Sequence, residues 1–403
     1  MSAWCAQTAA IMGFTFVMPF LRLYLRDELG LTDDTSRALW SGFIFGAPGF
    51  VMGFAAPMWG ILADRVGRKV MVMRAMFGGA VVIGLMGLAT SPTHILILRL
   101  CQGALTGTIT ASAALVASVS PSDRAGFSMG MMQAAIFAGN AVGPVVGGIT
   151  SDAIGARPAF FISGALLMVG GVLITVFATE GHSHPRESTG EGQTFGQVLR
   201  SPGFIGILLL MFVMRLSRAF PGVIFQEYVE VLVGERGDVN TVAGFLLAVM
   251  FLTASITSML MGRLADRVGY ASLIIAGTIA GGAICIPQAW VSALWQLFVL
   301  RILLGVAAGT IGPAMGKFVH ASFPPSSHGR AFGIVQSANS FAFSIGPLAG
   351  GFVNAAFIPH FGPVTALKLP FAVAGVFQLV VGFVAWGVFA RLRGRGGECA
   401  ASE

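Results

Sequence analysis

Long apolar segments, separated by short polar ones, dominate the pattern of this chain. They cover residues 3–25, 39–60, 70–90, 94–118, 126–150, 158–178, 203–229, 240–262, 270–291, 293–318, 331–355 and 366–390. Most are near twenty residues long, which is the length that an α-helix needs to cross a bilayer and more than a barrel strand uses. The pattern therefore predicts an all-α membrane protein with twelve transmembrane helices.

Composition excludes several other classes of protein. Of the 403 residues, 55% are hydrophobic and 10% are charged, whereas a soluble domain of this size carries far more charge. In a membrane protein the net charge of +7 describes loops, so it does not indicate a nucleic-acid partner. The four cysteines form no CxxC pair and no group with histidine, and no nucleophile or phosphate-loop motif occurs. We expect no metal, no cofactor and no enzymatic activity.

The longest polar interruption divides the chain. It spans residues 180–202 and has the composition of a flexible linker. We predict an N-terminal six-helix half (1–179), a cytoplasmic linker (180–202), a C-terminal six-helix half (203–390) and a cytoplasmic tail (391–403). With the N-terminus inside, the cytoplasmic segments hold fourteen Lys and Arg residues and the outer segments hold five. This bias predicts that both termini lie in the cytoplasm.

The two halves repeat each other in sequence. The charged loop at 60–69 recurs in weaker form at 262–270, and segment 98–108 matches 300–310. Segment 130–148 likewise matches 333–351. Three blocks in one order and nearly one register indicate a duplication. Two halves in the same orientation, related by an axis along the membrane normal, are the expected outcome.

Three motifs carry a family resemblance. They are Gly60-Ile-Leu-Ala-Asp64-Arg65-Val-Gly67-Arg68-Lys69, Ile95-x3-Arg99-x2-Gln102-Gly103 and Gly130-x8-Gly139-x3-Gly143-Pro144-x2-Gly147-Gly148. With them the chain resembles the major facilitator superfamily, and more narrowly its drug:proton antiporter branch of multidrug-resistance exporters with twelve spans. The resemblance implies the pseudo-symmetric major facilitator fold in a bacterial inner membrane. It also implies proton-coupled efflux of drug-like or amphiphilic molecules by alternating access.

The same resemblance implies a conformational hinge in the first motif. That role falls on Gly60, Asp64, Arg65, Gly67, Arg68 and Lys69, and in the second half on Asp266 and Arg267. Exposed ion pairs are worth about 0–1 kcal/mol, so they can bias a conformational equilibrium without freezing it. The simpler interpretation is a basic loop that only sets the orientation of the chain.

The second and third motifs imply coupling and gating. Arg99 lies inside a span, where a charge is costly unless it is paired or hydrated, and the family implicates this arginine in proton transfer. An arginine whose head reaches the outer interface is the alternative. The third motif, Gly130, Gly139, Gly143, Pro144, Gly147 and Gly148, predicts a bendable fifth helix that packs closely and serves gating.

The positions of the acidic residues differ from those in the exporter branch, in which many members keep an acid in the first helix. Residues 3–25 contain none, and of seventeen acids only Glu227 lies within a span in a position to reach the interior. Five arginines lie within spans: Arg22, Arg99, Arg215, Arg218 and Arg301. Glu227 is therefore the candidate for proton coupling together with Arg99. Alternatively, the arginines line a site for an anionic metabolite or lipid, with or without proton coupling.

Polar residues within the spans are the candidates for substrate contacts. They are Arg22, Gln102, Gln133, Asn140, Arg215, Arg218, Gln336 and Asn339. The expected partners are a small-molecule substrate, protons and the lipid bilayer, and the expected state is a monomer. A membrane sensor or scaffold that transports nothing is the competing class, and the intact motifs argue against it.

Overall fold

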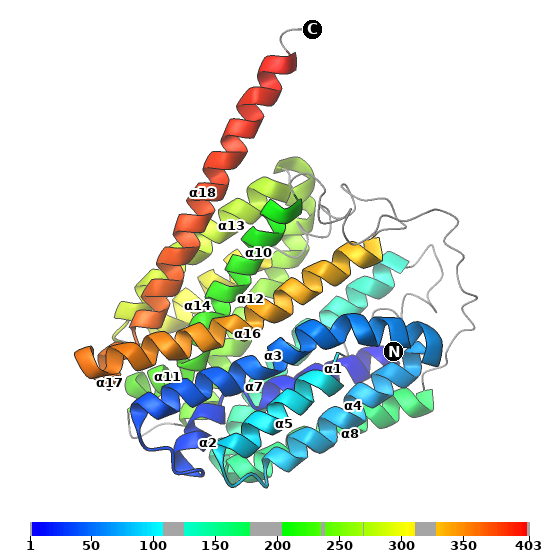
Figure 1. Cartoon of the computed structure of the whole chain (residues 1–403), viewed down its shortest axis with the longest axis vertical. Coiled ribbons are helices and arrows are strands. Elements are labelled where there is room, and N and C mark those ends of the chain that lie inside the picture. Colours follow the sequence, from blue (N-terminus) through cyan, green and yellow to red (C-terminus); the bar gives the residue numbers. More distant parts are fainter. Residues whose placement is uncertain are drawn as a thin grey trace.

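The computed structural model describes residues 2–107, 125–177, 204–234, 238–268, 270–310 and 328–400, and within these ranges it contains helices and no strand. The N-terminal half comprises α1 (Ser2–Phe16), α2 (Leu21–Asp27), α3 (Asp34–Val66), α4 (Arg68–Met86), α5 (Pro92–Leu105), α7 (Ala125–Ile154) and α8 (Ala156–Phe177). The C-terminal half comprises α10 (Phe204–Ala219), η1 (Phe220–Val223), α11 (Phe225–Val233), α12 (Val239–Val268), α13 (Tyr270–Cys285), η2 (Ile286–Trp290), α14 (Leu294–Gly309), α16 (His328–Phe361), α17 (Pro363–Ala366) and α18 (Leu369–Ala400). Figure 1 shows that most of the long helices run along one another as a bundle.

The helices follow the predicted spans in order. Ten helices of the described chain are long and apolar enough to cross a membrane, and α14 is a shorter apolar helix. The all-α membrane fold is thereby confirmed. The predicted linker at 180–202 lies outside the described residues, and α18 continues as a helix into the segment predicted as a tail. The helix start that differs most from the prediction is that of α3, which begins at Asp34 and not near residue 39.

Two of the spans are interrupted at equivalent places. Pro19 lies in the turn between α1 and α2, and Pro221 lies in η1 between α10 and α11. Proline has no backbone N–H to donate, so it favours a break in a helix. Beyond each break a buried tyrosine donates its hydroxyl to a backbone carbonyl, Tyr24 to the end of α4 and Tyr228 to η2. The two halves, which are related in sequence, therefore also make equivalent contacts.

Glycines allow α7 to approach two helices at once. Gly143 and Gly147 are four residues apart, so they share one face of the helix, and this face packs against α1. A Cβ atom on Gly147 would collide with the backbone carbonyl of Phe16. Gly148 faces the other half of the chain, where a Cβ atom would collide with the backbone of Asn240 at the start of α12.

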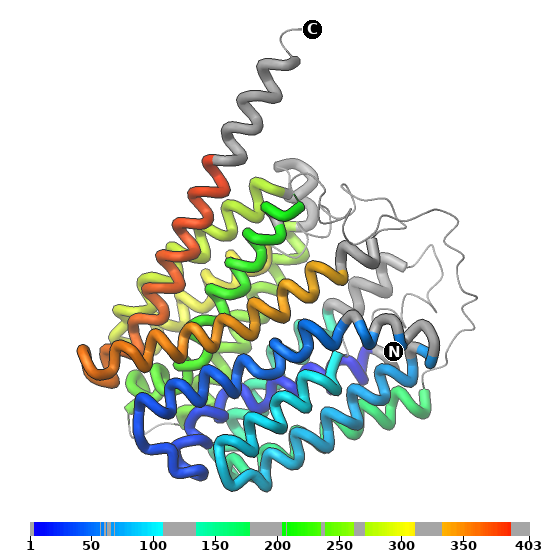
Figure 2. The backbone as a smooth tube through the Cα atoms, viewed as in Figure 1, coloured from blue at the N-terminus to red at the C-terminus, as the bar shows by residue number. Residues whose placement is uncertain are grey.

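The second half uses the same arrangement. Gly350 packs against the backbone of Phe220, and Gly351 packs against the backbone of Ala38 on α3. The helices α3 and α16 consequently run side by side, as do α7 and α12 (Figure 2). These two interfaces join the halves. We call the end of the bundle that carries the connections 28–33, 87–91 and 362–368 the outer-loop face, since it is the side predicted to lie outside the cell.

Candidate functional site

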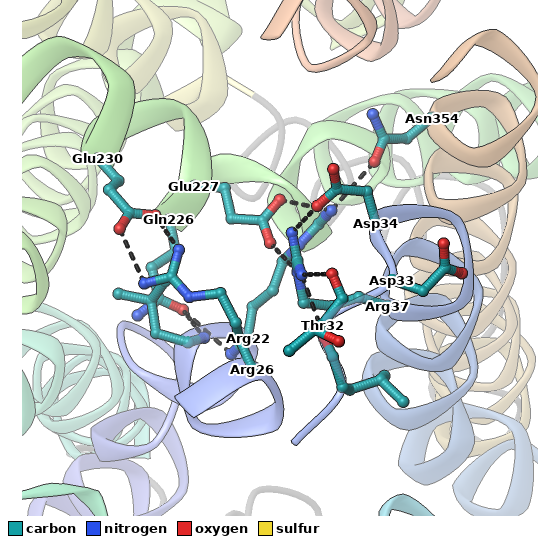
Figure 3. Close-up of polar contacts among 12 residues, drawn as sticks. Arg22, Arg26, Thr32, Asp33, Asp34, Arg37, Gln226, Glu227, Glu230 and Asn354 are labelled. Atoms are coloured by element: carbon teal, nitrogen blue, oxygen red, sulfur yellow. Dashed lines mark hydrogen bonds and ion pairs between the residues drawn. The ribbon is translucent and has the colours of Figure 1, made fainter. Parts of the chain in front are cut away.

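Buried charges meet where the two halves join at the outer-loop face (Figure 3). We call this group the outer clasp. It consists of Arg22, Arg26, Asp34 and Arg37 from the N-terminal half and Gln226, Glu227, Glu230 and Asn354 from the C-terminal half.

Glu227 is the centre of the outer clasp. Its Oε2 lies 2.6 Å from Nη2 of Arg22, and its Oε1 lies 2.5 Å from Nε of Arg37. Glu227 is 6% exposed and Arg22 is 1% exposed, so these charges meet out of reach of bulk water. Burying ions is expensive, and it is tolerated when the partners and their remaining hydrogen bonds compensate the loss of water. The carboxylate of Glu227 thus holds two arginines of the N-terminal half.

The two arginines also donate to acceptors other than Glu227, although Nε of Arg22 is buried without a hydrogen-bond partner. Arg22 donates from Nη1 to the carbonyl of Val223 at 3.1 Å and from Nη2 to Oδ1 of Asn354 at 3.0 Å. Arg37 donates from Nη1 to two carbonyls of the preceding loop, at 3.1 and 3.2 Å, and it pairs with Asp34. These contacts orient both guanidinium groups toward Glu227. The hydrogen bonds and the ion pair of the Arg22 side chain therefore go to the C-terminal half, whereas Arg37 is also held by its own half.

A second ion pair lies closer to the solvent. Arg26 donates from Nη1 and Nη2 to the two carboxylate oxygens of Glu230, each at 2.8 Å, and its Nε donates to Asp27 at 2.7 Å. The side chains of Arg26 and Glu230 are about one third exposed. Water screens such a pair, so it contributes less than the buried pairs around Glu227.

Asp152 makes another connection between the halves. It lies near the end of α7, and its Oδ2 accepts from the backbone N–H and the hydroxyl of Thr241, both at 2.7 Å. Its Oδ1 accepts from Nδ2 of Asn240 at 2.7 Å. A carboxylate at the N-terminus of a helix is stabilised by the free N–H groups and the helix dipole. Gln226 donates to Asn240 and accepts from the backbone N–H of Arg22, so it links Asp152 to the outer clasp.

The predicted coupling residues do not all meet. Arg99 is 3% exposed, and its Nη1 donates to Oε1 of Gln102, three residues further along α5, at 3.1 Å. Within the described chain, the partners of Glu227 are arginines other than Arg99. Arg301, the repeat of Arg99, lies over the ring of Phe225 at 3.8 Å. Arg99 and Arg301 are therefore buried within their own halves.

The predicted substrate contacts lie on five helices, and the structure does not gather them at the clasp. Of these residues only Arg22 takes part in it. Asn140 donates to the carbonyl of Ile136 in its own helix, and Gln336 and Asn339 are half-buried on α16. Arg215 and Arg218 lie on α10 without a hydrogen bond or ion pair to any described residue. The side-chain environment of Gln133 lies outside the described residues.

The predicted hinge loop is almost entirely helical: Gly60, Asp64 and Arg65 lie in the last turns of α3, Arg68 and Lys69 begin α4, and only Gly67 between them is not helical. Asp266 and Arg267 likewise lie at the end of α12. Gly67 has a φ of +106°, a conformation that favours glycine, and it lies between Val66 and Arg68. Lys69 donates from Nζ to the carbonyl of Thr175 at 2.9 Å, which is a contact within the N-terminal half. The side chains of several hinge residues, and the surroundings of Gly60 and Gly130, lie outside the described residues; these side chains are Asp64, Arg65, Arg68, Asp266 and Arg267.

Sequence reasoning placed Arg37 in an outer segment and gave it no role. A capping signal could have corrected this, because Asp33-Asp34-Thr-Ser is typical of a helix start. Oδ2 of Asp33 accepts from the backbone N–H of Ser36 at 2.7 Å. Hydrogen bonds from Ser36 lower the pKa of Asp33. No local sequence pattern predicted that Asp152, Asn240 and Gln226 would form one hydrogen-bond network.

Known proteins of similar sequence and structure place the chain in a family. The family model of the Major Facilitator Superfamily matches residues 3–232 and 231–401. The multidrug resistance protein MdtG of Citrobacter koseri is 32% identical over 340 residues, covering 83% of each chain. MdtG of Escherichia fergusonii is 33% identical over 341 residues, covering 83% of this chain and 82% of that relative.

Solved structures share the fold at low sequence identity. The nucleoside transporter NupG superposes with a TM-score of 0.80 at 12% identity, over 96% of this chain and all of that chain (100%). A bacterial homolog of the human lysosomal transporter Spinster superposes with a TM-score of 0.79 at 16% identity, over 97% and 96% of the two chains. With its order of apolar helices, its internal repeat and these matches, the chain belongs to the Major Facilitator Superfamily of membrane transporters.

Proposed function

We propose that this chain exports drug-like or amphiphilic small molecules from the bacterial cytoplasm across the inner membrane, in exchange for protons and by alternating access. Relatives that cover most of the chain are named multidrug resistance proteins, which supports this class of substrate. The bias of Lys and Arg supports an orientation with both termini in the cytoplasm. In that orientation the outer-loop face is the extracytoplasmic side.

The observation that carries the coupling proposal is the position of Glu227 between two arginines of the other half. When the outer-loop face is closed, Arg22 and Arg37 neutralise the carboxylate. When the halves separate there, Glu227 leaves both arginines and becomes accessible from outside, where a proton can neutralise it instead. On closure the arginines return and displace this proton, which leaves toward the cytoplasm because the outer-loop face is then shut. The arginines and the proton thus compete for one carboxylate, and the competition ties proton entry to the change of conformation.

Other predicted residues act around this exchange in the proposal. Arg99 influences proton transfer through the field of its buried charge and not through contact with Glu227. The hinge at Asp64 controls the opposite face, and the glycine motif of α7 allows the halves to close tightly. The partners are the substrate, protons and the lipid bilayer, and the transporting unit is a monomer.

A carrier for an anionic metabolite or lipid is the second candidate. It is favoured by one observation, namely that Arg215 and Arg218 have no acidic partner in the described chain. This candidate does not require coupling to protons. It differs from the first in the charge of the transported molecule, so a substrate panel separates the two.

Transport by purified protein in liposomes tests the coupling proposal. Under an imposed pH gradient, Glu227→Gln should abolish gradient-driven transport while substrate binding persists, because glutamine cannot exchange a proton. Glu230→Gln on the same helix is the matched control, since it removes a carboxylate from a pair that is about one third exposed. Normal gradient-driven transport by Glu227→Gln would move the coupling to another acid, such as Asp27 or Glu28, or indicate a facilitator without protons.

A further inference from the structure

The charges of the described membrane helices are unevenly distributed. The acids of these helices whose side chains the structure describes lie at the outer-loop face, and each is engaged by an arginine or by the start of α12; they are Asp27, Asp34, Asp152, Glu227 and Glu230. Apart from Arg74, which lies over the ring of Trp59 at 3.4 Å in the first half of α4, four arginines with described side chains in these helices have no carboxylate partner among the described residues: Arg99, Arg215, Arg218 and Arg301. A charge inside the membrane costs several kcal/mol unless it is paired or hydrated, so each of these arginines requires an explanation.

Two of the four have partners within the protein. Arg99 is 3% exposed and bonded to Gln102, and Arg301 is 6% exposed and stacked on Phe225. Nη1 of Arg301 also lies 3.7 Å from the sulfur of Met250. A cation over an aromatic ring in a desolvated position gains about 2 kcal/mol. These side chains are closed off from any ligand, so they serve the structure of their halves.

Arg215 and Arg218 are different. Arg215 is exposed and Arg218 is half-buried, and Nε of Arg218 is buried without a hydrogen-bond partner. The two residues are three positions apart on α10, so their side chains are neighbours on the helix surface, and their charges repel each other. In this structure their repulsion is not compensated by any described acid.

Arg215 lies deep within a membrane-spanning helix, so the exposure of its side chain indicates what surrounds it. It lies eleven residues after the start of α10, which at 1.5 Å per residue is about 16 Å along the helix. The side chain is shorter than this distance, so the guanidinium cannot reach the N-terminal end of α10, and beyond Ala219 the span continues through η1 and α11. An exposed guanidinium at this depth cannot rest against lipid tails. It requires water enclosed by the protein or an anion.

The neighbours of Arg215 on the same helix are apolar. Phe212 and Leu208 precede it by three and seven residues, which is the spacing of one helix face, and both are half-buried. Arg218 also borders a small gap lined by Gly277, Gly281 and Gln378. The surface of α10 therefore combines two cations with partly accessible apolar side chains.

We propose that Arg215 and Arg218 bind the anionic group of amphiphilic organic anions, and that such molecules are a substrate class of this transporter. A carboxylate or phosphate accepts two parallel hydrogen bonds from a guanidinium, and the anion removes the repulsion between the two arginines. The apolar body of the ligand lies along Phe212 and Leu208. Lipophilic cations are repelled from the same surface. This inference rests on the proposed transport function and specifies its substrate.

A matched series of fluorescent probes tests the inference. Pyrenebutyrate, pyrenebutanol and a pyrenebutyl trimethylammonium salt share an apolar body and differ in charge. Binding to the purified protein is measured by fluorescence anisotropy, and transport is measured in liposomes under a pH gradient. We expect the anion to bind at least tenfold more tightly than the cation. Arg215→Gln should weaken binding of the anion about tenfold and leave the neutral alcohol nearly unchanged, whereas Arg215→Lys should retain part of the affinity.

Controls separate the site from general effects. Arg215 is exposed, so its replacement leaves the packing of α10 intact, and a melting curve verifies folding. Arg157→Gln removes a positive charge from an exposed pair with Glu28 at the outer-loop face and should not change binding. Equal affinity for cation and anion, or an unchanged affinity of Arg215→Gln for the anion, would overturn the site. If none of the three probes were transported in liposomes, the result would count against the transport function. If only the cation or the alcohol were transported, it would count only against the anion site.

Discussion

Arg22 on α2 and Glu227 on α11 form a buried ion pair, with Nη2 and Oε2 2.6 Å apart, that joins the two halves of the transporter. Both side chains have lost their water, so neither can be left alone without a large cost. Opening of the outer-loop face must separate them. The pair therefore stabilises the closed state only as long as Glu227 is ionised, and in the proposed mechanism this links protonation to conformation.

Replacement of Arg22 should open the outer-loop face. In Arg22→Gln, Glu227 keeps only Arg37, and loss of one partner of a buried pair costs about 3–5 kcal/mol. The closed state should lose population accordingly. Pulsed EPR distances between labels at the exposed positions Leu88 and Trp290, one in each half, would measure the shift. Arg157→Gln is the control, because its partner Glu28 belongs to the same half. Unchanged distances in Arg22→Gln would show that the pair does not hold the halves together.

Replacement of Asp152 should have a smaller effect in the same direction. Asp152→Ala removes three hydrogen bonds to the start of α12, and the loss of a helix cap costs about 0.5–2 kcal/mol. The same pair of labels would report a partial increase in the open population. Thr150→Val removes a hydrogen bond only within α7, to the carbonyl of Val146, and should leave the distances unchanged. If the label distances in Asp152→Ala equalled those in Thr150→Val, the contact of Asp152 with α12 would not contribute to holding the halves together.

A methyl group on Gly147 should disturb the packing of α7 against α1. In Gly147→Ala the new Cβ atom would collide with the carbonyl of Phe16, and overpacking costs about 1–3 kcal/mol. A lower melting temperature and slower transport are the expected results. Gly84→Ala on α4 is the matched control, since no other atom lies within 4 Å of a Cβ there. Alanine is the better helix former, so Gly84→Ala should melt at the same or a higher temperature. Equal melting curves for the two variants would contradict the close approach.

The two hinge segments should differ in their effect on transport. Asp64→Asn is expected to reduce transport strongly, with folding intact, because the residue lies at the charged end of α3, which biases the conformational equilibrium in the proposed mechanism. The second segment has Tyr270 where the first has Arg68, and it lacks a counterpart to Lys69. Asp266→Asn should therefore cost less activity. Initial transport rates, normalised to folded protein, would check this. Equal losses of activity in the two variants would indicate that the two hinge segments contribute equally.

Some residues of the site could be predicted from the sequence, and others could not. Glu227 was recognisable because it is the one acid whose position within a span allows it to reach the interior. The bond from Arg99 to Gln102 joins residues three apart on one helix, which is a local spacing. Arg37 was missed, since hydropathy placed the start of its helix five residues too late. The stacking of Arg301 on Phe225 joins two helices and has no signature in either segment.

The sequence by itself determined the membrane helices, the repeat and the close-packing face of α7. The hydrocarbon thickness dictates the length of an apolar segment, and a backbone without water must bond within its own helix, so these features depend on local residues alone. Only the tertiary structure decided which charges become partners. Arg22 and Glu227 come together because α2 and α11, both beyond a proline break, meet where the two halves join. Such a contact depends on how the halves pack, and no local pattern encodes it.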